Sequence, residues 1–380
     1  MTQPQTDAFD EETAAHVTAC RDAVPTTPPN AELTFGFDGF IDNVRELVDV
    51  RHDAENYTPM RELGAFGDRI RRSADADSSV STEWHRSGRR AGGHVAHLSR
   101  ATGTVGFDPT MLGTFGIPSD PVFDDEFEQY ERYTLGEPTI TDAVEFDDGK
   151  LLLQETGSQR RLNWERLCDR VGIETLADAV DGATVLGIGY WANIPELPTI
   201  WNGLATELWP LLSEPPESVF LDPADIRQLS TERLRSGLEP LAELDDTVPV
   251  TVSANRAETA VLARPRSTER HDGTLRDAAE RARDALGVTR YAAHSSSASA
   301  LAGPETTARV AVPQTDDPVL TTSAGDHFTA GLVLAHLIGI TNGPSLVLGN
   351  ALAGHFVRNG APPTYEELLT FVDRYATLFD

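Results

Sequence analysis

The chain has 380 residues and a mass of 41.2 kDa, which suits one large α/β domain or two smaller ones. Its two cysteines, Cys20 and Cys168, belong to no CxxC or Cys/His cluster, which excludes a disulfide scaffold and a zinc module and favours a reducing cytosol. The formal charge of −29 disfavours nucleic acids and anionic membranes as partners.

The charge also indicates a salt-rich environment. A hydrophobic content of 39% argues for a packed core rather than for acidic disorder. Such a chain would repel itself in dilute buffer, whereas at molar salt the Debye length falls to roughly 3 Å and the repulsion is screened. We therefore predict a cytoplasmic protein of a high-salt organism. The acidic N-terminus lacks the apolar core of a signal peptide, and no apolar run is long enough to span a membrane.

The first predicted elements are a peripheral extension and a buried strand. Residues 1–30 contain one helical stretch, 11–24, and end in a Pro-rich connector. From Leu33 the run LTFGFDGFID predicts a strand that ends in a loop, and 45–51 is expected to continue as a strand.

A glycine-rich stretch, a short strand and a hairpin follow in chain order. A helix is expected to open at Gly92 and Gly93, and residues 110–113 are expected to form a strand. Two β-like runs flank Asp148-Gly149, which predicts a hairpin. Segments near 44–52 and 140–156 are expected to form a small β appendage.

The second half of the chain alternates strand-like and helical patterns. Such alternation predicts an α/β fold with a largely parallel, doubly wound sheet and active-site loops at the carboxyl ends of its strands. The expected strands are 184–191, 218–223, 248–253 and 290–295, and the expected helices are 231–244, 274–286, 325–338, 344–359 and 365–378.

The segment 320–339, LTTSAGDHFTAGLVLAHLIG, carries the strongest chemical signal. The small residues Ser323, Ala324 and Gly325 let backbone N–H groups approach a ligand, and the following helix contributes the positive end of its dipole. This pattern is typical of an anion site. Asp326 at its mouth would accept a proton from an attacking hydroxyl, or would only cap the helix.

At this point the chain resembles the ribokinase-like carbohydrate kinases, the PfkB family. Their signature is Asp-Thr-Thr-Gly-Ala-Gly-Asp before an aromatic residue, and here 320–328 reads Leu-Thr-Thr-Ser-Ala-Gly-Asp-His-Phe, with Leu320 and Ser323 as departures. The resemblance implies a ribokinase-like kinase domain over 31–380, whose doubly wound, mostly parallel sheet is flanked by helices and carries a small β lid. It also implies Asp326 as the catalytic base and residues 323–325 as the anion hole.

Two further segments resemble the family's acceptor site. GFDGFID matches its first strand and loop, which makes Asp42 the best candidate for binding sugar hydroxyls and Asp38 the second. Gly92-Gly93-His94 resembles the family's Gly-Gly-Asn, with His94 in place of the asparagine. Without the resemblance, these carboxylates would be ordinary turn residues and the histidine an ordinary surface residue.

Other segments match the nucleotide side of the family's site. Asn255 and Glu258 form its Asn-x-x-Glu, which acts near Mg²⁺ and the nucleotide phosphates. Asp222 matches a strand-end Asp-Pro that helps position the metal, and Asn350 matches a polar position in the helix that lines the purine site. Mg²⁺ prefers oxygen ligands and keeps most of its waters, so this set suffices chemically.

One departure weakens the prediction of the donor. The family carries Thr-x-Gly-x-x-Gly where residues 293–298 read AHSSSA, so Ser295 and its neighbours would have to reach phosphate by hydroxyl and backbone N–H groups. ATP is the expected donor. ADP stays open, because GFDGFID is also similar to the ADP-dependent sugar kinases.

Two arginine pairs fit a phosphorylated acceptor. Arg89-Arg90 precede the double glycine, and Arg160-Arg161 follow the predicted hairpin. Arginine binds phosphate through two parallel hydrogen bonds, but such pairs can equally offset nearby acidic residues.

We therefore predict a sugar kinase that transfers the terminal phosphoryl group of a nucleotide to a sugar hydroxyl. The β appendage would act as a lid that excludes water and, by resemblance, as a homodimer interface. A nucleoside kinase or phosphosugar kinase of the same fold stays open, as does a non-catalytic nucleotide- or sugar-binding protein, which the departures at Leu320, His94 and Ser295 would favour. A dinucleotide oxidoreductase is discounted, because no GxGxxG with a downstream acidic residue occurs.

Overall fold

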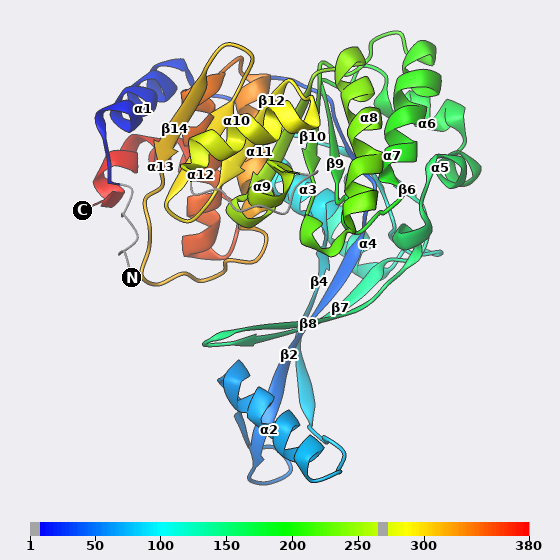
Figure 1. The fold of residues 1–380 in the computed structure, drawn as a ribbon, viewed down its shortest axis with the longest axis vertical. Coiled ribbons are helices and arrows are strands. Elements are labelled where there is room, and N and C mark those ends of the chain that lie inside the picture. Colours follow the sequence, from blue (N-terminus) through cyan, green and yellow to red (C-terminus); the bar gives the residue numbers. More distant parts are fainter. Residues whose placement is uncertain (1–7, 265–272, 380) are drawn as a thin grey trace.

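The computed structural model describes residues 8–264 and 273–379. Its body is a sheet between two layers of helices, from which a smaller lid projects (Figure 1). The sheet of the body consists, within the described residues, of β1 (Leu33–Gly36), β5 (Thr110–Gly113), β6 (Arg132–Thr134), β9 (Val185–Gly189), β10 (Ser218–Asp222), β11 (Val250–Asn255), β12 (Arg290–His294), β13 (Ala298–Ala302) and β14 (Thr307–Ala311).

The order of these strands is β14-β13-β12-β11-β10-β9-β1-β5-β6. The strands from β12 to β6 run parallel, and at the other edge β13 pairs antiparallel with both of its neighbours, β12 and β14. The predicted doubly wound, mostly parallel sheet is confirmed. These two edge strands were not predicted: β13 reads ASALA, without a β-branched or aromatic residue, and β14 reads TARVA, with only Thr307 and Val310 of that kind.

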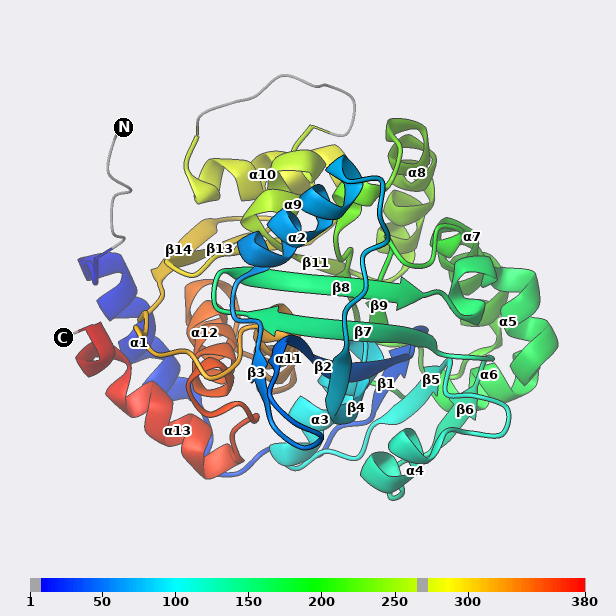
Figure 2. The same cartoon turned by 90° about the horizontal axis from the view of Figure 1, so that it is seen from below.

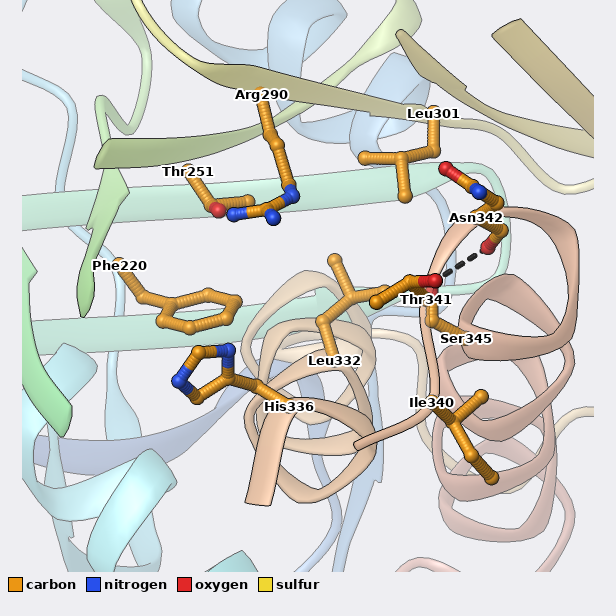
Figure 3. A pocket seen from close by; sticks show the side chains of 10 residues that line it. All are labelled: Phe220, Thr251, Arg290, Leu301, Leu332, His336, Ile340, Thr341, Asn342 and Ser345. Carbon is orange, nitrogen blue, oxygen red and sulfur yellow. Dashed lines mark hydrogen bonds between the residues drawn. The ribbon is translucent and has the colours of Figure 1, made fainter. Parts of the chain in front are cut away.

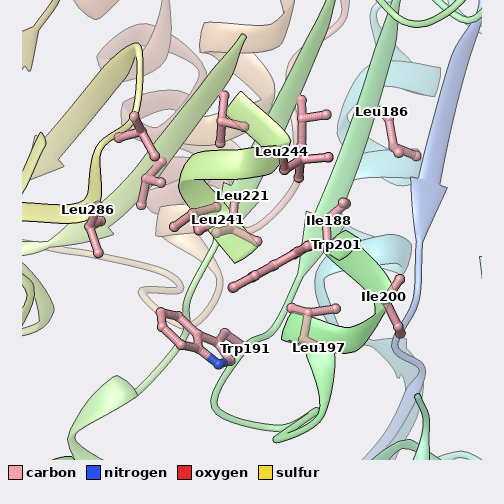
Figure 4. Close-up of a cluster of buried hydrophobic side chains, with 14 of the residues drawn as sticks. Leu186, Ile188, Trp191, Leu197, Ile200, Trp201, Leu221, Leu241, Leu244 and Leu286 are labelled. Carbon is pink, nitrogen blue, oxygen red and sulfur yellow. The ribbon is translucent and has the colours of Figure 1, made fainter. Parts of the chain in front are cut away.

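Both faces of the sheet are covered, because successive strand residues point to opposite sides. In β9, Leu186 and Ile188 enter one core (Figure 4), whereas the neighbouring Val185 enters the core on the opposite face. The first core packs against α5 (Trp164–Val171), α6 (Ile173–Val180), α7 (Leu197–Gly203), α8 (Thr231–Thr247), α9 (Arg256–Leu262) and α10 (Leu275–Leu286). The second packs against α1 (Glu11–Ala23), α3 (His94–Thr104), α4 (Pro121–Phe127), α11 (Ala324–Leu337), α12 (Asn342–Asn359) and α13 (Tyr365–Arg374).

The lid has its own sheet and a small core of its own. The core side chains Leu47, Val144 and Phe146 pack with Leu63 and Phe66 of the lid helix. Seen from below, the hairpin of the last two lid strands extends across the body (Figure 2). The lid elements are β2 (Phe40–Arg51), β3 (Tyr57–Pro59), β4 (Trp84–Gly92), β7 (Thr139–Phe146), β8 (Gly149–Glu155) and α2 (Leu63–Asp75).

The expected small β lid is thus present, and the predicted hairpin is β7 and β8 around Asp148. Residues 8–30 of the predicted peripheral extension hold α1, whose Val17 and Cys20 are buried against the body, and residues 1–7 lie outside the described part of the chain. Cys20 and Cys168 are both free thiols. Among the described residues no helix is long and apolar enough to cross a membrane.

Candidate active site

A cleft of about 880 Å³ lies at the carboxyl ends of β10, β11 and β12, beside the start of α11. Parallel strands end at one edge of a sheet, so residues distant in sequence meet there. The predicted residues that line this cleft are Asp222, Asn255, Glu258, Ser295, Ser323, Ala324, Gly325, Asp326 and Asn350.

The predicted anion-binding element is the first turn of α11. Ser323 adopts the left-handed region, with φ of 71°, and leads directly into the helix. Its carbonyl accepts the hydrogen bond of His327 N–H at 3.2 Å. The amides of Gly325 and Asp326 come earlier in the turn, where a helix offers no internal acceptor, so they are available to an anion in the cleft.

Asp326 is an ionised, nearly buried carboxylate in this turn. Its Oδ1 accepts hydrogen bonds from His94 Nδ1 and from the Tyr190 hydroxyl, both at 2.8 Å. Burial raises the pKa of Asp326, but the hydrogen bond from His94, the nearby His97 and the bond from Tyr190 outweigh it and lower the pKa to about 2. Asp326 can therefore accept a proton at neutral pH.

His94 lies close to both Asp326 and Asp222, the last residue of β10. The side chain is fully buried, and its pKa is raised: burial lowers it, but the contact with Asp326 more than compensates. The ligand atoms of His94, Asp222 and Asp326 all lie within 4.8 Å of one another. The structure thus brings together three residues that the sequence places on separate motifs.

The double glycine leaves room for the carboxylates of Asp38 and Asp42. Gly93 has φ of 91°, and a Cβ there would lie 2.8 Å from Asp38 Oδ2, while a Cβ on Gly92 would lie 2.5 Å from Asp42 Oδ2. Asp38 accepts the N–H groups of His94 at 2.8 Å and Val95 at 3.0 Å, which caps α3, and burial raises its pKa to about 6. Asp42 lies in β2, opposite Arg90 of β4.

Asn255 and Glu258 hold each other at the start of α9. The Asn255 side chain accepts the N–H groups of Ala257 at 2.9 Å and Glu258 at 3.1 Å, while Glu258 Oε2 accepts Asn255 N–H at 2.9 Å. Burial raises the pKa of Glu258 to about 7. Burial also raises the pKa of Asp222 well above its usual value; His94 opposes this rise, and Asp326 and Glu258 add to it. Crowded, buried carboxylate oxygens of this kind fit the ligand preference of Mg²⁺.

A model of the prokaryotic ketohexokinase family matches residues 9–375. The chain belongs to this family. It is 48% identical over 371 residues, 98% of each chain, to the ketohexokinase of Haloferax volcanii. It is therefore a sugar kinase, a phosphotransferase that uses a nucleotide donor and an alcohol acceptor, as predicted.

Solved structures of low identity share the fold of this kinase, as the resemblance implied. Ribokinase from Thermotoga maritima is 16% identical, with a TM-score of 0.60 over 90% of this chain and 99% of its own. A mutant of phosphofructokinase-2 from Escherichia coli is 15% identical, with a TM-score of 0.63 over 92% of this chain and 100% of its own. Arabidopsis thaliana ribokinase in complex with ribose and ATP is 16% identical, with a TM-score of 0.59 over 91% and 99%.

Two predicted nucleotide contacts of the kinase are engaged within the protein. Ser295 Oγ donates to the Ala298 carbonyl at 2.9 Å and accepts Ala298 N–H at 3.1 Å, which closes the turn between β12 and β13. Asn350 Nδ2 donates to Ser299 Oγ at 2.9 Å and to the Tyr375 hydroxyl at 3.0 Å. Their roles toward the nucleotide stay predictions.

The arginine pairs do not line the cleft. Arg160 donates to the Ala192 carbonyl at 3.3 Å, and Arg161 borders a separate hollow of about 700 Å³. Arg89 forms two hydrogen bonds with Asp120, at 2.8 and 2.6 Å. Arg90 alone lies near the acceptor side, where its charge opposes the rise in the pKa of Asp42 that burial causes.

Three site residues carry no motif in the sequence. Tyr190 directly follows β9 and donates to Asp326 Oδ1. His97 Nε2 and Ser323 Oγ are 2.8 Å apart, which ties α3 to the anion turn. Lys150 reaches the cleft from the lid. A polar residue at the end of a predicted parallel strand was the one signal available for Tyr190.

A further, small hollow, lined by Arg290, His336 and Asn342, lies beside α11 and the start of α12 (Figure 3). Its volume of about 30 Å³ has room for little more than a water molecule. The cleft at the start of α11, which gathers the predicted motif residues, is therefore the candidate substrate site.

Proposed function

We propose that this kinase phosphorylates a ketohexose and that Asp326 is its general base. The observation that carries the proposal is the geometry of the carboxylate. Both hydrogen bonds, from His94 and Tyr190, go to Oδ1, which leaves Oδ2 for the hydroxyl of the acceptor. The ketohexose is suggested by the matched family and by the relative in Haloferax volcanii.

In the proposed reaction, the acceptor hydroxyl gives its proton to Asp326 as its oxygen bonds to the terminal phosphorus of the donor. The bond from that phosphorus to the bridging oxygen breaks, and the shortened nucleotide leaves. The amides of Gly325 and Asp326, at the start of α11, stabilise the charge on the transferring group. Positioning and electrostatics of this kind are the main contributions a protein makes to phosphoryl transfer.

ATP is the proposed donor, and Mg²⁺ the proposed metal. A similar fold binds ATP in the ribokinase from Arabidopsis thaliana. Asp222 and Glu258 would hold the metal, with Asn255 orienting Glu258. When bound, Mg²⁺ neutralises charge on the donor phosphates.

The acceptor would lie between the lid and the base. Asp42 would bind the hydroxyls of the acceptor beside Gly92 and Gly93. Asp38, which accepts the backbone N–H of His94, would act indirectly by holding His94 in position. Arg160 and Arg161 stay predicted contacts for a phosphorylated acceptor, which a free ketohexose does not require.

The lid would close over the reactants and also join two copies of the chain. The proposed contact between two copies is supported by apolar side chains that the lid exposes: Leu153 is 49% exposed, and Val50 is 48% exposed. The charge of −29 and the haloarchaeal relative support a salt-rich cytoplasm as the place of work.

The test is donor consumption in molar KCl with Mg²⁺, with ATP or ADP offered against ketohexoses, aldohexoses, sugar phosphates and nucleosides. We expect turnover with ATP and a ketohexose, and a sugar phosphate as product. Preferential turnover of a nucleoside or a sugar phosphate would instead support those kinases. Nucleotide binding without turnover of any acceptor would support a non-catalytic binding protein.

A further inference from the structure

Lys150 is the lone lysine in a chain whose other 30 basic residues are arginines, since Lys and Arg together number 31. It lies beside the turn between β7 and β8, opposite Glu145. Its ammonium group donates a hydrogen bond to Thr322 Oγ1. The same group lies 3.5 Å from Thr321 Oγ1 and 3.3 Å from Glu145 Oε1. The lid thus touches the polypeptide just before the anion-binding turn.

The side of β8 that carries Lys150 faces the cleft. Residues two apart in a strand point to the same face, so Lys150 and Leu152 share one side. Leu152 lines the cleft together with Thr322 and Asp326, although it is 52% exposed. The position of Lys150 on this face therefore places its ammonium group toward the reactants.

The cleft has a deficit of positive charge for a polyphosphate ligand. The carboxylates in its lining belong to Asp222, Asp225, Glu258 and Asp326. Arg358 is the cationic side chain of the described lining, and it donates to the carbonyls of Pro313 and Gln314, both at 2.8 Å. Among the described residues, the partners of Lys150 are two threonine hydroxyls and the carboxylate of Glu145, which is 45% exposed to solvent. The ammonium group can therefore exchange these partners for phosphate oxygens at little cost.

We propose that Lys150 binds the terminal phosphate of the donor and holds it against the first turn of α11 during transfer. The proposal rests on the assignment of the chain as a nucleotide-dependent kinase. In the complex, the ammonium group leaves Thr322 and donates to an oxygen of the transferring group. A cation on the lid couples closure of the lid to the presence of the donor phosphate.

The lone lysine permits a chemical test in the wild-type chain. An amine-acylating reagent would modify Lys150 and the chain's α-amino group, and peptide mass spectrometry distinguishes the two sites. We expect a non-hydrolysable ATP analogue with Mg²⁺ to slow acylation of Lys150 and leave that of the α-amino group unchanged. An unchanged rate at Lys150, with calorimetry showing the analogue bound, would overturn the proposal, as would protection by the sugar alone.

Variants supply the second test. Lys150→Met should lower kcat/KM for the donor about 10- to 100-fold, as loss of a charged hydrogen bond does, and Lys150→Arg should retain most activity. Arg71→Met, on the exposed surface of the lid helix α2, is the matched control. Equal donor kinetics in Lys150→Met and wild type would contradict the proposal. Because the acylation test needs no acceptor, its result is independent of whether the acceptor is a ketohexose.

Discussion

His94 stands where the resemblance implies an asparagine, and its Nδ1 lies 2.8 Å from Oδ1 of Asp326. The hydrogen bond matters because Asp326 is only 5% exposed, and burial alone would raise its pKa. Without hydrogen-bond donors beside it, a buried carboxylate would take up a proton at a higher pH, and the enzyme would lose activity earlier on acidification. We interpret His94 as a residue that positions the base and keeps it ionised.

This interpretation predicts a shift in the pH profile. His94→Ala should raise the pKa of Asp326, so the acid limb of kcat/KM should move to higher pH, while His94→Asn, which retains an N–H donor, should shift it less. The measurement is kcat/KM from acid to alkaline pH, with His52→Ala on the exposed lid as control. Superimposable profiles for wild type and His94→Ala would show that His94 does not tune the base.

At the scale of elements, the lid sheet has two different faces. Leu152 lines the cleft, whereas Leu153 points to the other side, in the row of Asp142 and Asn43. The helix α2 covers Leu151 on that outer side but leaves Leu153 exposed. Leu153 is thus an apolar side chain open to solvent on the outer side, and a second copy of the chain would remove it from water.

We predict a dimer formed through this outer face. Sedimentation in molar KCl should give twice the chain mass of 41.2 kDa. Leu153→Asp should shift the mass toward that of one chain, because a buried charge without a partner opposes association. Leu211→Asp, at a leucine that is 56% exposed on the body, should leave the dimer intact. A wild type that sediments as one chain would exclude the lid interface.

At the scale of the whole molecule, a protein with a net charge of −29 has to bind a nucleotide, which is itself strongly negative. High salt screens the surface at distances beyond a few ångström but affects direct contacts in a partly buried cleft much less. We therefore expect the site to depend on short contacts, namely the helix amides, the proposed metal and the proposed contact of Lys150, rather than on the long-range field of the protein.

The fold and much of the cleft were predictable because parallel strands end at one edge. Asp222 and Asn255 end adjacent strands, so their convergence follows from the alternating pattern of strands and helices. Tyr190 and Lys150 were not predictable as site residues, because their contacts to Asp326 and Thr322 span 136 and 172 positions and depend on side-chain direction. The turn at Ser295 likewise depended on an antiparallel strand that small residues concealed.

The most direct test of Asp326 as the general base is the turnover of Asp326→Asn with ATP and a ketohexose in molar KCl. The amide keeps the size of the side chain but cannot take the proton, so we predict that kcat falls about 10²- to 10⁴-fold while the KM of the donor changes little. Asp124→Asn, which replaces a 46% exposed carboxylate paired with Arg132, should retain full activity. A folded Asp326→Asn enzyme with wild-type kcat would contradict the assignment of Asp326 as the base.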